Sequence, residues 1–517
     1  MAGLMISERD RLVEQARALH DAGHPAQAED CLRRVLNQDP THAFALTLMA
    51  ELAIERRDID AAIRHAQAVL SQQPNFAPAL SHLAQALWLA GRMTEGLEPA
   101  RRAVAVQPGN PLFRVNLGQL CAWLGRREEA EAAVRPVLEQ TWHPPEMRAR
   151  AHGVIGEALT AQGEFDSAHA ALEQAIALAP GHEALHMAYA ISLLRLGRLR
   201  EGWESYRRRH RIAFFFPGQG TGLPGTLWQG QDLTGRTILL RDEQGYGDAI
   251  QFFRYIPLLR KAGAGRIVLS TFPLLAPLFQ ASTGLAEVVT AATLDRAPDF
   301  HCPTGDLPGG CGTTLETIPA EVPYIRPPPE AMKTAPALPA GKGPSVGLVW
   351  SGDPRHVTDH LRSIPASVFL RIADLPGVRF VSLQNAVRGA DLPALTARPR
   401  VVRIGETLTD FGQTAALVSQ LDLVIAVDTS VAHLAGAMGK PVWLLLPRAP
   451  DWCWLIGRED SPWYPTVRLF RAGADGWAPV IERVRQALGE YLDDRRTPPP
   501  PLAHRQQRGP RAHYEQE

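Results

Sequence analysis

The 517-residue chain contains 54 Lys and Arg and 54 Asp and Glu, so its formal net charge is zero with His neutral. This balance excludes the cationic excess on which DNA-coating proteins and polybasic membrane binders depend, and no nucleic-acid partner is expected. Apolar residues make up 45% and charged residues 21%, a composition typical of globular domains, and the length predicts about three of them.

The sequence carries no visible targeting or cross-linking signal. No apolar run approaches the ~18 residues that a membrane span needs, and the N-terminal stretch turns polar without the hydrophobic segment of a secretory signal. The cysteines are far apart, and none forms a C-x-x-C pair: Cys31, Cys121, Cys302, Cys311 and Cys453. We therefore expect free thiols, no metal site and a cytoplasmic location.

Residues 1–211 repeat with a period of 34. Prolines recur at Pro40, Pro74 and Pro108, and a turn-type marker recurs at Gly23, Arg57, Gly91, Gly125, Gly163 and Gly197, with one longer step near Thr141–Pro145. Small residues precede each marker (Ala16, Ala50, Ala84, Gly118, Gly156, Ala190) and follow it (Ala28, Ala62, Gly96, Ala130, Ala168, Gly202). The pattern predicts about six helix–turn–helix units, in which small residues let paired helices approach closely and proline ends the second helix.

This repeat resembles the tetratricopeptide repeat over roughly residues 9–211. The resemblance implies an α-solenoid whose groove binds a peptide or a partner protein; a spacer or a dimerisation arm is the alternative. Trp203 and Tyr206 share one helical face and are interpreted as a plug at the end of the solenoid. The basic run 207–211 is interpreted as a solvated helix end.

The second half alternates short apolar runs with helical stretches. A Gly- and Pro-rich linker is expected over 212–234, followed by strands at 237–241, 266–271, 287–290, 299–302, 345–350, 379–384, 401–404, 422–427 and 442–446. The runs group into two lobes, 235–335 and 343–476, and a helix over 477–493 precedes a tail over 494–517 that is expected to be disordered. The expected fold class is α followed by α/β, with ligands bound where the carboxyl ends of two sets of parallel strands face each other.

The first candidate site is the turn after strand 237–241. Gly245 and Gly247 let the backbone approach a ligand, and the following helix start can bind an anion. The turn is not a dinucleotide fingerprint, because Ile250 stands where a third glycine is required, nor is it a P-loop. Asp248 is either a general base or the N-cap of a helix over 249–261.

The second candidate site follows strand 422–427. Asp428 ends the strand and is expected to cap a helix that Thr429 and Ser430 open, where hydroxyl and N–H groups can bind a phosphate. His433 lies four residues after Thr429, on the same face, and can donate to a phosphate or a sugar. The alternative for His433 is a histidine buried between helix and sheet.

The third candidate site is the polar loop after strand 345–350. Arg355, His356 and Arg362 can neutralise a pyrophosphate leaving group, or they belong to an exposed loop. Trp350 and Gln384 end neighbouring strands and are weaker candidates for contacts with a nucleotide or sugar. The tryptophans of the segment 447–464 are expected to pack in the core rather than stack on a ligand.

The three sites, in this order, resemble glycosyltransferase family 9, the heptosyltransferase-like group, over roughly 235–490. The family's Gly-Asp motif and later proline are matched by Gly247, Asp248 and Pro257, and its Asp-Thr/Ser-x-x-x-His-Leu-Ala motif by Asp428, Thr429, His433, Leu434 and Ala435. The resemblance implies a GT-B pair of Rossmann-like domains, an acceptor-side lobe followed by a nucleotide-sugar-side lobe, and sugar transfer with inversion and without a bound metal. A lysine of the family's middle segment is not evident here, so Arg355 or Arg362 would take its place.

The resemblance implies that Asp248 is the base and that Thr429, Ser430 and His433 bind the diphosphate of the donor. From the three candidate sites themselves, Gly245, Gly247, Arg355, His356, Arg362 and Asp428 are also expected to contribute to donor and phosphate binding. A repeat array joined to a GT-B half is also similar to protein O-GlcNAc transferases, which implies a protein acceptor as well as a glycan one. No cofactor is expected, since the nucleotide-sugar is a substrate. The alternative is a non-catalytic repeat scaffold with a degenerate glycosyltransferase domain.

Overall fold

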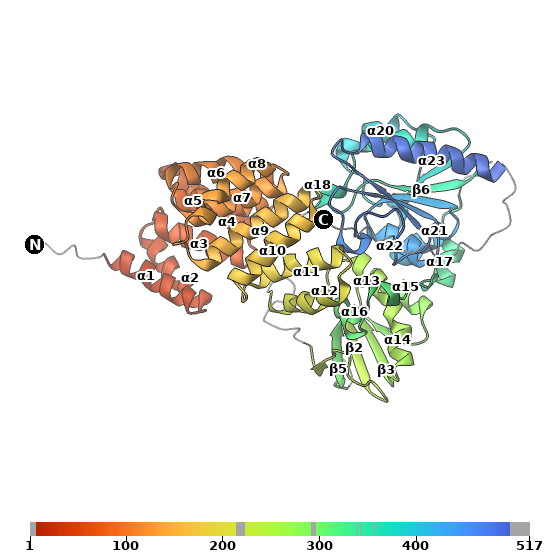
Figure 1. Cartoon of the computed structure of the whole chain (residues 1–517), viewed down its shortest axis with the longest axis horizontal. Coiled ribbons are helices and arrows are strands. Elements are labelled where there is room, and N and C mark those ends of the chain that lie inside the picture. Colours follow the sequence, from red (N-terminus) through yellow and green to blue (C-terminus); the bar gives the residue numbers. More distant parts are fainter. Residues whose placement is uncertain are drawn as a thin grey trace, which may run out of the picture.

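The computed structural model describes residues 7–212, 223–290, 296–338, 340–341, 343–356 and 358–496. A helical array occupies one side of the molecule, and two α/β lobes occupy the other (Figure 1). The array is coloured from red to yellow, the first lobe green and the second cyan to blue. This is the predicted order of an α-solenoid followed by two parallel-sheet domains.

The array consists of six antiparallel helix pairs, as predicted. They are α1 (Glu8–Asp21), α2 (Pro25–Gln38), α3 (Ala43–Glu55), α4 (Ile59–Gln72), α5 (Ala77–Leu89), α6 (Met93–Val106), α7 (Pro111–Trp123), α8 (Arg127–Glu139), α9 (Pro145–Ala161), α10 (Phe165–Leu178), α11 (Glu183–Arg195) and α12 (Leu199–Tyr206), and a 3₁₀ helix η1 (Arg207–Arg211) follows. All six markers turn the chain with a left-handed φ between 63° and 82°. The longer step of the repeat extends α9, which has 17 residues where α7 and α11 have 13.

The small residues of the repeat lie where paired helices touch. Ala28, Ala62 and Ala84 are fully buried. A Cβ at Gly118 would lie 2.7 Å from Val134 Cγ1, and one at Gly156 would lie 2.8 Å from Leu172 Cγ. The helices therefore approach to a distance at which a larger side chain does not fit.

The first lobe has a five-stranded parallel sheet in the order β1-β5-β2-β3-β4. Its strands are β1 (Thr226–Leu227), β2 (Thr237–Arg241), β3 (Arg266–Ser270), β4 (Glu287–Val289) and β5 (Phe300–Pro303), and its helices are α13 (Tyr246–Phe252), α14 (Ile256–Lys261), α15 (Ala276–Ser282) and α16 (Leu307–Gly310). The next helix in the chain, α17 (Pro329–Thr334), packs against α21 (Phe411–Ser419) of the second lobe (Figure 1). Thr226 pairs with Phe300 within the stretch that was predicted as a linker, so the sheet starts earlier than expected. Residues 213–222 of that linker lie outside the described part of the chain.

The second lobe has a six-stranded parallel sheet in the order β11-β10-β9-β6-β7-β8. Its strands are β6 (Ser345–Val349), β7 (Arg379–Ser382), β8 (Val402–Arg403), β9 (Leu423–Val427), β10 (Val442–Leu446) and β11 (Val467–Arg471), and its helices are α18 (Asp359–Arg362), α19 (Ala366–Phe369), α20 (Leu392–Thr396), α21 (Phe411–Ser419), α22 (Ser430–Ala437) and α23 (Ala478–Arg496). The edge strand β11 was not predicted, because its VRLFR sequence alternates with charge. Helix α23 extends past the predicted end at 493, and residues 497–517 lie outside the described part.

One apolar core joins the array to both lobes. It contains Leu194 and Trp203 from the array, Phe252 from the first lobe, and Trp452 from the second. Trp203 therefore packs as the predicted plug. The basic run after it is not solvated throughout as expected, because Arg209 is fully buried.

None of the helices within the described ranges is both long enough and apolar enough to pass through a bilayer.

A test of the helix packing is Gly118→Ala, with Gly109→Ala as its control in the same array. Helix propensity alone favours alanine over glycine by about 1 kcal/mol. We expect Gly118→Ala instead to destabilise the array by about 1–3 kcal/mol, since its Cβ would overlap Val134 and Val154. A Cβ at Gly109 meets nothing within 4 Å, so the control should unfold like the unmodified chain. Thermal unfolding followed by far-UV circular dichroism measures both, and a higher Tm for Gly118→Ala would contradict the packing.

Candidate active site

The first two candidate sites meet where helix α13 of the first lobe packs against helix α22 of the second. A Cβ at Gly247 would lie 3.0 Å from His433 Cδ2 and 3.4 Å from His433 Nε2. The backbone of Gly247, in the first helical turn of α13, therefore lies directly against the imidazole ring. The structure brings together two segments that are about 190 residues apart in the sequence.

The turn between β2 and α13 places Asp248 in the first turn of the helix. Gly245 is the N-cap, so the helix begins at Tyr246, three residues earlier than predicted. The Gly245 N–H donates to Asp248 Oδ2 at 3.1 Å. The Asp248 side chain therefore folds back onto the N-cap residue and helps to cap its own helix. The carboxylate still lies at the junction between the lobes while it does so.

The environment of Asp248 raises its pKa to about 7. Burial is the largest cause, and the negative charges of Asp451 and Glu243 add to it. His433 and the Gly245 N–H act in the opposite direction. A carboxyl group with this pKa can accept and release a proton near neutral pH.

The second candidate site lies at the end of strand β9. Thr429, rather than Asp428, is the N-cap of α22, and its hydroxyl donates to the Val427 carbonyl oxygen at 3.3 Å. The expectation that Asp428 caps this helix is therefore wrong, because the extended backbone of Thr429 takes that position. Thr429 and Ser430 are half-buried at the helix start, where N–H groups and the helix dipole favour an anion.

His433 is held between a carboxylate and a phenol. Its Nδ1 is hydrogen-bonded to the Tyr464 hydroxyl at 2.9 Å, and its Nε2 lies 3.7 Å from Asp428 Oδ1. Burial opposes the charge on Asp428, but His433 and then Arg362 outweigh it and keep the pKa of Asp428 below its usual value. His433 is therefore buried, as the alternative interpretation expected, and its ring lies against Gly247, while donation from His433 to a phosphate or a sugar stays a prediction.

The third site is only partly brought to the junction. Arg362 lies over Gly352, is mostly buried, and is close enough to Asp428 to lower the pKa of that carboxyl. Arg355 is exposed and forms an ion pair with Asp353 at 2.7 Å, so it belongs to the exposed-loop alternative. His356 is an exposed residue at the edge of the junction, and partial desolvation and the positive charge of Arg362 lower the pKa of its imidazole.

Trp350 and Gln384 support the second lobe from within. Trp350 is fully buried and donates from Nε1 to Asp391 Oδ2 at 3.0 Å. Gln384 is clamped to Ser351, donating from Nε2 to the carbonyl oxygen at 3.0 Å and accepting from the N–H at 3.3 Å. The protein therefore already uses the Trp350 N–H and most of the Gln384 amide, and a contact of either residue with a nucleotide or a sugar stays a prediction.

Several site residues were not identified from the sequence. Asp451 reaches solvent, but protein surrounds most of its carboxyl group. The resulting desolvation raises the pKa of Asp451, and the negative charge of Asp428 raises it further. Trp454 packs 5.1 Å from the His433 ring, and the other aromatics of 447–464 are buried as expected. Arg254 of the first lobe donates to the Trp463 carbonyl oxygen of the second at 2.5 Å. The density of tryptophan in 447–464 was the one signal pointing to this segment.

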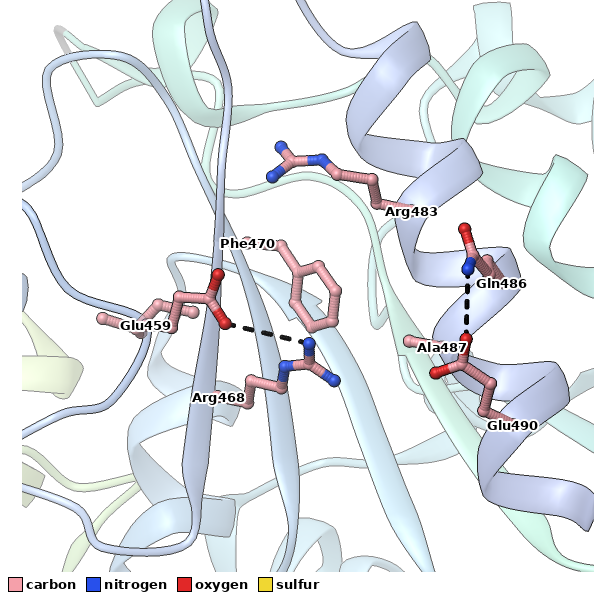
Figure 2. A pocket seen from close by; sticks show the side chains of 8 residues that line it. Glu459, Arg468, Phe470, Arg483, Gln486, Ala487 and Glu490 are labelled. Atoms are coloured by element: carbon pink, nitrogen blue, oxygen red, sulfur yellow. Dashed lines mark hydrogen bonds and ion pairs between the residues drawn. The ribbon is translucent and has the colours of Figure 1, made fainter. Parts of the chain in front are cut away.

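One concave feature of the second lobe lies away from these residues. A shallow pocket lies between β11 and α23, where Arg468, Arg483 and Glu490 are among the lining residues (Figure 2). Arg468 forms an ion pair with Glu459, and no predicted site residue lines the pocket.

Within the described ranges, no group of three or more His, Cys, Asp or Glu side chains is arranged to hold a metal ion.

Comparison with known proteins agrees with this architecture. Residues 47–111 and 159–202 match tetratricopeptide repeat families, and residues 405–445 match glycosyltransferase family 9 (heptosyltransferase). Protein FlbA of Caulobacter vibrioides is 29% identical over 449 residues, which cover 81% of this chain and 74% of FlbA.

Two solved structures resemble the array. A thermophilic TPR protein of Thermus thermophilus is 22% identical with a TM-score of 0.31, and the match covers 36% of this chain and 99% of that one. A tetratricopeptide repeat protein from Parabacteroides merdae is 17% identical with a TM-score of 0.32, covering 39% of this chain and 78% of that one.

The chain therefore carries tetratricopeptide repeats in its N-terminal part and a glycosyltransferase family 9 domain in its C-terminal part. Its two parallel sheets are consistent with a GT-B pair of Rossmann-like lobes. The matched range 405–445 includes β9, α22 and the Asp428–His433 segment.

The opposite pKa shifts of two site carboxyls provide a test by stability. The pKa of Asp248 is raised in the folded chain, so its contribution to stability is present at low pH and is lost as pH rises towards and through about 7. We expect Asp248→Asn to abolish this loss, so that its Tm relative to the unmodified chain rises between pH 5 and pH 8.

Asp428→Asn is the matched control for that measurement. The pKa of Asp428 is lowered, so its contribution is complete above the unfolded value and is lost only at more acidic pH. Asp428→Asn should therefore lower the Tm by a similar amount throughout pH 5–8. A pH-independent Tm difference for Asp248→Asn would show that the carboxylate is not desolvated.

Proposed function

We propose that the protein is an inverting, metal-independent glycosyltransferase that moves a sugar from a nucleotide-sugar to a protein or glycan acceptor. The observation that carries this is the contact of the Gly247–Asp248 turn with His433 at the start of α22. It places a carboxyl group of one lobe beside a helix start and a histidine of the other. A base and an anion-binding element on opposite sides of one junction are what transfer from a diphosphate leaving group requires.

Asp248 is the base in this mechanism. Its carboxylate removes the proton from the acceptor hydroxyl, the oxygen attacks the anomeric carbon, and the bond from that carbon to the diphosphate oxygen breaks with its electron pair. A single displacement of this kind inverts the anomeric configuration. The pKa near 7 supports the role, since the group then binds a proton readily but is still ionised in part at neutral pH.

The departing diphosphate is stabilised by the second lobe. The N–H groups of Thr429 and Ser430 and the Ser430 hydroxyl at the α22 start bind the anion in this proposal, and His433 and Arg362 supply a hydrogen-bond donor and a positive charge. The Thr429 hydroxyl would have to leave the Val427 carbonyl oxygen to contribute. Gly245 and Gly247 allow the donor to approach the backbone of the turn. His356 is a further candidate at the edge of the site, whereas Arg355 would have to leave Asp353 to contribute.

The repeat array recruits the acceptor or a partner protein in this proposal. The similarity to FlbA extends over most of both chains and so includes array and lobes together. The second candidate function is a scaffold in which the glycosyltransferase domain binds a nucleotide but no longer turns over. The buried polar roles of Trp350 and Gln384 favour neither candidate, because both would keep the fold.

The proposal is tested with a panel of nucleotide-sugars, followed by thermal shift and by release of nucleoside diphosphate. We expect one donor to raise the Tm and to be turned over at the same rate with and without EDTA. Asp248→Asn should keep donor binding but reduce kcat about 100- to 10,000-fold. His433→Ala should reduce kcat about 100-fold, since a transition-state hydrogen-bond donor is removed.

Absence of turnover with every donor, combined with a thermal shift that Asp248→Asn leaves unchanged, would favour the scaffold. A strict requirement for a divalent cation would contradict the metal-independent mechanism. Arg355→Ala serves as a control for non-specific loss of charge at the loop, and its kcat should change less than that of Arg362→Ala.

The close approach at the junction gives a separate test, Gly247→Ala. The added Cβ would press on His433, which cannot shift freely because its Nδ1 is hydrogen-bonded to Tyr464 and Asp428 lies 3.7 Å from its Nε2. We expect kcat to fall about 10- to 100-fold through misalignment of the base and the phosphate site. Gly489→Ala, whose Cβ meets nothing within 4 Å, is the matched control. Full activity in Gly247→Ala would mean that the lobes separate at this point during turnover.

A further inference from the structure

The last helix pair of the repeat array reaches the turn that carries Asp248. Tyr206 at the end of α12 and Arg209 of η1 are buried, with 2% and 0% of their surface exposed. Gln244 Nε2 donates to the Tyr206 hydroxyl oxygen at 2.6 Å, and Arg209 forms an ion pair with Glu243. Two consecutive residues of the turn are thus held by the array, immediately before Gly245.

Arg209 belongs to a cluster of polar side chains that pair with one another. Arg209 Nη1 also donates to Asp306 Oδ1 at 2.5 Å, and His210 Nε2 lies 2.8 Å from Asp306 Oδ2. The Gly305 N–H donates to Glu243 at 3.2 Å, and a Cβ at Gly305 would lie 2.6 Å from Glu243 Oε1. Charges buried this tightly are held in one geometry, since loss of either partner leaves an uncompensated charge.

The backbone at the held position is in a rarely adopted conformation. Gln244 has a φ of 64°, in the left-handed region that favours glycine. Such a conformation persists in a non-glycine residue only where surrounding contacts enforce it. The contacts here are the side-chain hydrogen bond to Tyr206 and the neighbouring ion pair of Glu243.

The same helix pair also contacts the second lobe. Arg195 at the end of α11 donates from Nε to the Pro450 carbonyl oxygen at 3.1 Å, and its charge acts on Asp451. The ring of Trp203 meets that of Trp452 edge to face at 5.1 Å. In Figure 1 the labels α11 and α12 accordingly lie next to α13 and α16, at the boundary between the array and the lobes.

We propose that Tyr206 and Arg209 are positioning residues of the transfer reaction, and that the last repeat is therefore an integral part of the catalytic centre rather than a detachable recruitment arm. They fix Glu243 and Gln244 and thereby aim Asp248 at the acceptor hydroxyl. The inference rests on the proposed function, because it takes Asp248 as the base.

Charged and titratable groups from four elements face Asp248. They are Asp451 and Cys453 from the 447–455 segment, His433 from α22, Glu243 from the turn, and Tyr206 from the array. Glu243 is the group through which the array acts electrostatically, since its negative charge favours the protonated form of Asp248. Glu243→Gln removes that charge while Arg209 keeps its pair with Asp306.

The experiment compares full-length Tyr206→Phe, Arg209→Met and Glu243→Gln with Asp248→Asn as the reference. Arg208→Ala is the control, because Arg208 pairs with Glu183 inside the array. We expect Tyr206→Phe and Arg209→Met to reduce kcat about 10- to 100-fold with unchanged affinity for the nucleoside diphosphate. We expect Glu243→Gln to move the acidic limb of the kcat/KM pH profile to lower pH, and Arg208→Ala to change neither quantity.

Hydrogen exchange of the 243–252 amides is measured on the same variants without any substrate. Faster exchange in Tyr206→Phe and Arg209→Met than in Arg208→Ala supports the positioning role, even if Arg209→Met is too unstable for kinetics. Unchanged kcat, pH profile and exchange in Tyr206→Phe, with activity lost in Asp248→Asn, would overturn this inference and leave the proposed function intact. If the unmodified chain shows no transfer, the proposed function fails, and the exchange data alone decide whether the array holds the turn.

Discussion

The junction between the two α/β lobes depends on one close contact, that of the Gly247 backbone with the His433 ring. A Cβ at position 247 would press on the His433 ring, so glycine suits the distance at which α13 and α22 approach each other. Arg254 secures the same junction by donating across it to the Trp463 carbonyl oxygen and by lying 4.5 Å from the Tyr464 ring. Because Tyr464 is also hydrogen-bonded to His433, the aromatic segment 447–464 both connects the two lobes and fixes the imidazole of His433.

Three carboxyl groups share this junction, and their surroundings give them different properties. Asp428 has His433 and Arg362 beside it, which outweigh its burial and keep it ionised. Asp248 and Asp451 are mainly desolvated and lie near other negative charges, and their pKa values are raised. Separation of pKa values within one site is how proteins assign the roles of base and permanent anion to chemically identical groups. The helix start at Thr429 then provides the fixed positive end that a cluster of acids would otherwise lack.

The repeat array and the lobes form one body at their boundary. The polar cluster of Arg209, Glu243 and Asp306 is buried between them, and the apolar core passes through Trp203 from one to the other. A spacer would be joined to the lobes by a solvated linker, whereas this array contacts the first lobe through Tyr206 and the second through Arg195. The last helix pair of the array is therefore in direct contact with the residues that precede Asp248.

Elements with local signals could be predicted from the amino-acid sequence. The 34-residue period was enough to predict six helix pairs, because close helix packing requires small residues and the turns require a left-handed φ. Apolar runs located all the strands except β1, which is short, and β11, which carries charged residues. Motif spacing found Gly247, Asp248, Thr429 and His433. Folding then determined which of these meet, and that Arg362 joins them while Arg355 pairs with Asp353 and Trp350 is enclosed. Burial and long-range pairing arise only when distant chain segments come together. The sequence therefore showed a basic run at 207–211 and an aromatic-rich segment at 447–464, but not which residues Arg209, Asp451 and Tyr464 contact.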